Sequence, residues 1–192
     1  MIPTAGFAQV EVRTSAELRD WLLVHHAQAD SVWLVTWKKN PGALYVSVGE
    51  VLDELIAFGW IDGVRRKIDG ARTMQLISPR KQQAWAQTYK NRAARLSVEG
   101  RMHPAGRAAI DEAKQAGRWN EMAAVDALQV TDGLAIALNE RPAAADFFAS
   151  VAPSYRRNVL RWLHSAKRPE TRAARIARIV DTAAKSEKLP QL

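Results

Sequence analysis

The sequence has 192 residues, of which 47% are apolar and 25% charged, so it is long enough for one full domain or for a domain with a small helical partner. It contains no cysteine, which excludes disulfides, thiolate catalysis and cysteine-ligated zinc sites. Its formal net charge of +8 at pH 7 creates a field that attracts phosphates, acidic proteins or anionic surfaces.

Neither a secretory signal nor a membrane-spanning segment is expected. Residues 1–14 contain no basic leader and no apolar core of the kind found in signal peptides. No apolar run approaches the roughly 18 residues that a membrane helix needs. We therefore expect a soluble, cytoplasmic protein without an integral membrane segment.

The first predicted elements are a helix and a strand. Thr14 and Glu17 have the spacing of a capping box, which predicts that a helix begins here. The β-branched and aromatic residues of 32–37 predict a central strand, closed by a turn at 40–42. A second capping box, Ser47 with Glu50, predicts another helix.

A hairpin is predicted next, because Asp69-Gly70 separates two strand-like runs at 60–68 and 71–77. A two-residue turn there predicts four pairs: Ile68 with Ala71, Arg66 with Thr73, Val64 with Gln75 and Asp62 with Ile77. Alternation then predicts two faces: Asp62, Val64, Arg66 and Ile68 on one, and Ile61, Gly63, Arg65 and Lys67 on the other. Neither face is clearly apolar, so which one meets the core stays open.

The rest of the chain has a helical pattern. The predicted helices span 84–97, 104–116, 133–139, 142–150, 153–166 and 169–184. The stretch 118–133 is the best candidate for a linker. We predict an α+β fold, with a small antiparallel sheet and helices in residues 1–120, followed by an all-helical region at 121–192 that packs on it.

Catalytic and metal-binding signatures are missing from the sequence. There is no nucleophile elbow, zinc-protease motif, phosphate-binding loop or dinucleotide fingerprint, and the four histidines are scattered. We therefore expect no metal site, no cofactor and no catalytic residue.

One stretch still suggests a pocket, because an acid lies among tryptophans and arginines. Its residues are Trp60, Asp62, Arg66, Arg80 and Trp85. Arginines near a carboxylate favour the ionised form, which suits a structural ion pair better than a proton donor. A small-anion site or an enzyme site here remains the less favoured interpretation.

Positive charge is concentrated in two windows. Residues 65–95 contain nine Lys/Arg and one acid, and residues 154–180 contain eight Lys/Arg and one acid. In the second window, helical spacing predicts basic faces on two consecutive helices. The residues proposed to bind an anionic partner are Arg157, Arg161, Arg168, Arg172, Arg175 and Arg178. A solvated basic surface without a dedicated partner is the plain alternative.

Several ordered blocks make the chain resemble the YdeI/OmpD-associated family, also called bacteriocin-protection proteins. The blocks are VWLVTWKK (32–39), FGWIDG (58–63), SPRK (78–81), GRMHPAGRAAIDEAKQAGRW (100–119) and APSYRRNVLRWLHSAKRPETRAARIARIV (152–180). The resemblance implies a small α+β part followed by a helical region, and a role in tolerating antimicrobial peptides or envelope stress. It implies no reaction and no catalytic residues.

Together these features favour a non-catalytic bacterial stress-tolerance or bacteriocin-protection type protein that binds an anionic protein or peptide through arginine-rich helices. The alternative is a nucleic-acid-binding protein that uses the same surface, with affinity that falls as salt rises. Aromatic residues are missing from the polar side of these helices, which counts against base stacking.

Overall fold

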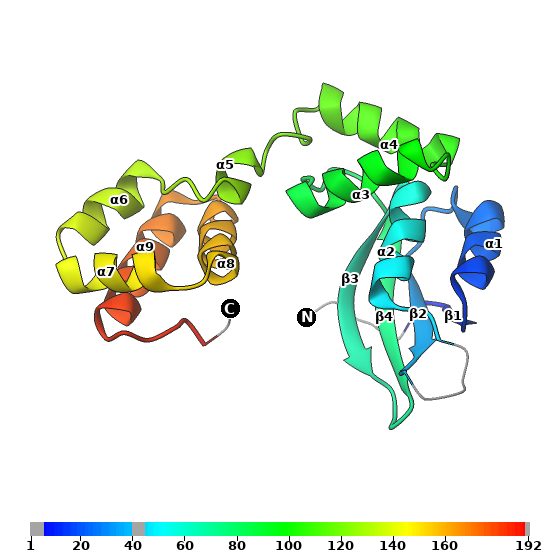
Figure 1. The fold of residues 1–192 in the computed structure, drawn as a ribbon, viewed down its shortest axis with the longest axis horizontal. Coiled ribbons are helices and arrows are strands. Elements are labelled where there is room, and N and C mark those ends of the chain that lie inside the picture. The colour runs from blue at the N-terminus through cyan, green and yellow to red at the C-terminus, as the bar shows by residue number, and fades with distance from the viewer. Residues whose placement is uncertain (1–5, 40–44, 191–192) are drawn as a thin grey trace. The chain divides into compact units, whose positions relative to one another are not determined.

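The structure is a computed structural model that describes residues 6–39 and 45–190. Contacts within the chain divide it into two compact units, Met1–Asn120 and Glu121–Leu192. The first unit contains a sheet with helices, and the second is helical (Figure 1). The predicted α+β class is therefore confirmed.

The described residues of the first unit form a four-stranded sheet. Its strands are β1 (Gln9–Val12), β2 (Val32–Trp37), β3 (Trp60–Lys67) and β4 (Arg72–Pro79), in the order β1-β2-β4-β3. Strand β2 is central as predicted, and its first five residues are buried. Strand β1 was not predicted, and it pairs with β2 in parallel, so the sheet is mixed rather than wholly antiparallel. The turn predicted at 40–42 lies outside the described residues.

Two capped helices cover one face of this sheet. Helix α1 (Ser15–His25) begins after Thr14, whose side chain accepts the Glu17 N–H at 3.1 Å. Helix α2 (Val48–Ala57) has a complete capping box between Ser47 and Glu50. The predicted starts of both helices are confirmed, but α1 lacks the second half of its predicted capping box, because the Glu17 carboxylate accepts the Arg13 N–H instead of the Thr14 N–H.

The core of the first unit lies between the sheet and these helices. Strand side chains on the helix-facing side, such as Leu34 and Ile77, pack with Leu18, Leu22 and Leu55. Trp33, Trp60 and Trp85 are among the largest fully buried side chains. The seven tryptophans of the sequence therefore contribute several rings to the interior, as their number suggested.

The hairpin forms, but its register differs from the prediction near the tip. Asp62 pairs with Ile77 as predicted, whereas Lys67, not Arg66, pairs with Thr73. The loop is longer than two residues, since the Ile68 N–H donates to the Arg72 carbonyl at 3.2 Å. A bulge between Asp62 and Arg65 absorbs the extra residue.

The bulge also changes which side chains share a face. Side chains normally alternate along a strand, but here Arg65 lies on the same face as Asp62. Arg65 donates to Thr73 Oγ1 at 3.1 Å and to Gln75 Oε1. The predicted assignment of Arg65 and Arg66 to faces is therefore wrong, because alternation could not include the bulge.

Helices α3 (Gln87–Val98) and α4 (Pro104–Gln115) complete the first unit. Two buried acids of helix α2 connect this helix to neighbouring elements. Asp53 accepts from Arg92 and Arg95, each at 2.6 Å, and Glu54 accepts from Arg19 at 2.9 Å and from Arg101 at 2.5 Å. Arginines 92 and 95 are therefore part of the fold, and their charge is compensated within it.

The described residues of the second unit form five helices. They are α5 (Ala123–Asp126), α6 (Asp132–Asn139), α7 (Pro142–Ser150), α8 (Pro153–His164) and α9 (Pro169–Ala184). Helix α9 packs against α6, α7 and α8, and α5 packs against α8. Short helix α5 lies within the stretch predicted to be a linker. Among the residues that the structure describes, no helix is both long and apolar enough to cross a membrane.

Candidate functional site

A polar track of hydrogen-bonded side chains, made of Asp62, Gln75, Arg65 and Thr73, runs along the helix-facing side of the sheet. Asp62 lies at one end of it. Its Oδ1 accepts from the Tyr89 hydroxyl, and its Oδ2 accepts from Gln75 Nε2 at 3.0 Å. Gln75 in turn accepts from Arg65 through its Oε1. Both carboxylate oxygens thus accept from neutral donors, which is the arrangement of a fixed acceptor in a partly buried network.

Arg80 lies beside this track and is 8% exposed. Its guanidinium is 4.1 Å from the Trp85 ring centroid and 5.3 Å from that of Tyr89. Burial lowers the pKa of Arg80 to about 10, although the negative charge of Asp62 opposes this shift. Among the described residues, Arg80 Nε and Nη2 and Trp85 Nε1 are buried without a hydrogen-bond acceptor.

The structure places the other two residues of the suggested pocket elsewhere. Trp60 is fully buried, donates from Nε1 to the His26 carbonyl at 3.0 Å and packs edge-on against Trp21. The Arg66 guanidinium lies 5.5 Å from the Trp33 ring, on the opposite face of the sheet from Asp62. Asp62, Arg80 and Trp85 are therefore connected through Tyr89, and Arg66 is not part of this group.

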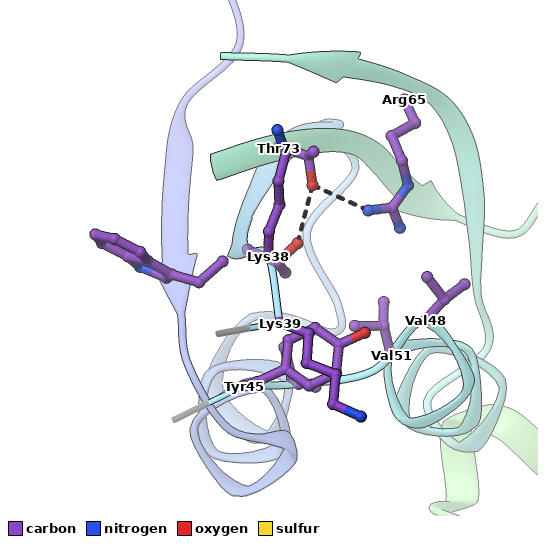
Figure 2. A pocket seen from close by; sticks show the side chains of 10 residues that line it. Lys38, Lys39, Tyr45, Val48, Val51, Arg65 and Thr73 are labelled. Carbon is purple, nitrogen blue, oxygen red and sulfur yellow. Dashed lines mark hydrogen bonds between the residues drawn. The ribbon is translucent and has the colours of Figure 1, made fainter. Parts of the chain in front are cut away.

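A cavity of about 200 Å³ opens at the other end of the polar track. Its positive residues are Lys38, Lys39 and Arg65, its hydroxyls come from Thr36, Thr73 and Tyr45, and Trp37, Val46, Val48 and Val51 complete its lining. Figure 2 shows the Arg65 guanidinium directed at the Thr73 hydroxyl, with Tyr45, Val48 and Val51 nearby.

The sequence did not predict this cavity, because its lining comes from β2, β3, β4, the first turn of α2 and described residues of the connection between β2 and α2. The bulge in β3 is what places Arg65 among these residues. The paired lysines after a buried strand were the one local signal that could have indicated it.

The arginines predicted to bind a partner are distributed over α8 and α9 and the turn between them. Arg157 and Arg161 approach one carboxylate, Asp126, at 3.9 and 4.0 Å. Arg168 is exposed at the N-cap of α9, and Arg172 follows one turn later. Arg178 is exposed as well.

Arg175 has a structural role in the second unit. It donates to the Trp162 carbonyl and to Ser165 Oγ at 2.7 Å, and its guanidinium lies 4.7 Å from the Trp162 ring. The predicted inward stripe of α9 is confirmed at Val180, which is buried, whereas Ala173 is exposed. Arg175 thus connects α9 to α8 through its Nη1 and its stacking on Trp162.

No group of three or more histidine, cysteine or acidic side chains within residues 6–39 and 45–190 has the arrangement of a metal site. His164 and Lys167 instead approach Glu121 at 3.2 and 3.8 Å. The cavity and the surface of α8 and α9 instead present arginine, lysine and hydroxyl donors. The chemistry that these donors offer is the binding of negatively charged groups.

Comparison with known families gives two matches along the chain. Residues 10–109, just over half of the chain, match a family model described as a domain of unknown function (DUF8412). Residues 127–186 match the model described as bacteriocin-protection, YdeI or OmpD-associated, which confirms the resemblance suspected from the sequence. No curated protein and no solved structure matches the chain significantly.

Proposed function

This chain belongs to the DUF8412 family, and on that premise we propose that it is a non-catalytic, cytoplasmic protein of the bacteriocin-protection type that binds an anionic partner through the arginines of α8 and α9. The match over residues 127–186 supports the general role, since it covers α6 to α9. The observation that carries the binding proposal is the excess of positive charge in this segment, with eight Lys/Arg and one acid in residues 154–180.

The binding surface centres on Arg168 and Arg172. Among the described residues, no carboxylate lies within salt-bridge distance of either side chain. Arg161 extends this surface, because it shares the single carboxylate of Asp126 with Arg157. Guanidinium groups that are not paired internally can make bidentate contacts with carboxylate or phosphate groups of a partner.

The first test is protection of living cells. A bacterial strain that lacks the protein is challenged with a bacteriocin while it produces the wild type, R168E/R172E or K67E/K81E. The two double variants change the net charge equally, but Lys67 and Lys81 belong to the first unit. We expect the wild type and K67E/K81E to restore survival and R168E/R172E to lose it. Full protection by R168E/R172E would contradict the proposal.

The second test identifies the class of partner. A DNA duplex of arbitrary sequence is titrated with the protein at roughly 50 and 200 mM salt, because a phosphate-backbone ligand must weaken steeply over this range. Weak binding of the duplex at both concentrations assigns the surface to an acidic protein or peptide. Tight, salt-sensitive binding that R168E/R172E abolishes assigns it to nucleic acid instead.

A further inference from the structure

The cavity at the end of the polar track combines positive charge with hydroxyl groups, of which that of Thr36 is buried. Thr36 is 5% exposed, and among the described residues its Oγ1 has one hydrogen-bond contact, to Thr73 Oγ1 at 3.4 Å. This distance exceeds the 2.5–3.0 Å range of a good hydroxyl hydrogen bond. Thr73 Oγ1 already accepts from Arg65, so its own proton is available to an acceptor in the cavity.

The positive groups around the cavity are not neutralised by acids. Arg65 donates to the neutral oxygens of Thr73 and Gln75, and Lys38 Nζ donates to the carbonyls of Asp69 and Gly70 at 3.3 and 3.0 Å. Within the described residues, neither of them nor Lys39 forms a salt bridge. Three like charges close to an apolar floor repel one another, and an anion bound between them relieves that repulsion.

We propose that this cavity binds the phosphoryl group of a small molecule, independently of the surface on α8 and α9. A phosphate monoester offers three acceptor oxygens and close to two negative charges at neutral pH. Arg65 and the hydroxyls of Thr36 and Thr73 supply donors on one side, and the lysines supply positive charge. A carboxylate would leave part of this donor set unused.

The cavity limits the size of the ligand. Pockets for drug-sized molecules span about 300–1,000 Å³, and this one is about 200 Å³. Val46, Val48 and Val51 line it with apolar surface that can contact a short carbon chain. The expected ligands are inorganic phosphate and small phosphate monoesters, of which glycerol phosphate is a convenient example.

Neighbouring arginines of β3 provide a matched pair of variants. Arg65 lies on the cavity side of the sheet and Arg66 on the opposite face, so R65Q and R66Q remove the same charge from the same strand. R65K is a third variant, which keeps the charge and loses the planar pair of donors.

Binding is measured by calorimetry on the full-length protein with inorganic phosphate, glycerol phosphate and acetate at constant ionic strength. We expect both phosphates to bind and acetate to bind at least tenfold more weakly. R66Q should keep the wild-type affinity, R65Q should lose tenfold or more, and R65K should be intermediate.

Equal losses in R65Q and R66Q would overturn the proposal, because they would show a general effect of net charge. Acetate binding as tightly as phosphate would overturn the phosphoryl assignment. Because these experiments leave Arg168 and Arg172 unchanged, their outcome is separate from that of the cell-survival test.

Discussion

At the scale of single residues, Arg80 carries a cost that the fold must offset. Lowering its pKa to about 10 corresponds to roughly 3 kcal/mol against burial of the charged form. Stacking on Trp85 and two hydrogen bonds, from Nη1 to the carbonyls of Gln83 and Ala84, act in the opposite direction. Two nitrogens of the buried Arg80 side chain lack a hydrogen-bond acceptor among the described residues. The charged form of Arg80 therefore lowers the stability of the fold at neutral pH.

Replacing Arg80 separates the effect of its charge from that of its shape. We expect R80M to have a free energy of unfolding within about 1 kcal/mol of the wild type, because it fills the space without a buried charge. R80K should be less stable than R80M, because it keeps a charge and loses the planar stacking. Urea unfolding at pH 7.5 measures both values, and a more stable R80K would show that a nearby negative charge stabilises a cation at position 80.

At the scale of elements, α4 approaches the end of α2 unusually closely. A Cβ at Gly106 would lie 2.2 Å from the Ala57 carbonyl oxygen, and real side chains essentially never come so near. The His103 N–H donates to the same carbonyl at 3.0 Å. Gly106 is thus needed because backbone meets backbone at this crossing.

Because of this crossing, replacing glycine by alanine should affect stability differently at two helical positions, Gly106 and Gly49. G106A should lose about 3 kcal/mol or more of stability, because α4 must move away from α2. G49A adds a Cβ that meets the Arg92 side chain at 3.7 Å, an ordinary contact, so it should keep or gain up to about 1 kcal/mol. Thermal unfolding of both variants checks the contrast, and equal stabilities would contradict it.

At the scale of the whole molecule, stability should fall in mild acid because of His103. Burial lowers the pKa of His103, and the nearby His26, Arg19 and Arg107 lower it further. Its Nδ1 accepts the Ala105 N–H at the start of α4, which requires that nitrogen to be unprotonated. The unfolded chain therefore binds a proton more readily, and stability decreases as the pH falls below about 6.5.

Urea unfolding of the wild type and H103N from pH 8 to pH 5 measures this dependence. Asparagine is a good N-cap and does not titrate in this range, so H103N should show a flatter curve with similar stability at pH 8. An unchanged slope in H103N would assign the acid sensitivity to other groups.

The sequence predicted the local features of the molecule better than its long-range ones. The N-caps Thr14 and Ser47, the buried strand at 32–37 and the pairing of Asp62 with Ile77 depend on neighbouring residues or on one turn. Strand β1 was missed because four residues are too few to show a period, and its partner lies over 20 residues away.

The candidate sites show the same limit. Periodicity identified arginines on α8 and α9, but Arg175 is held by Trp162 and Ser165, contacts that no single-helix pattern contains. Likewise, the conformation of the hairpin loop and the bulge decide that Arg65, rather than Arg66, faces the cavity.

The bulge has a consequence for how this surface can change in evolution. With one residue fewer between Asp62 and Arg65, the bulge would disappear, and regular alternation would still place Arg65 on the same side as Asp62, facing the cavity. Regular pairing at unchanged length would instead bring Arg66 to the cavity side, so a single-residue deletion in this short segment preserves the arginine presented there, whereas loss of the bulge without a deletion exchanges it.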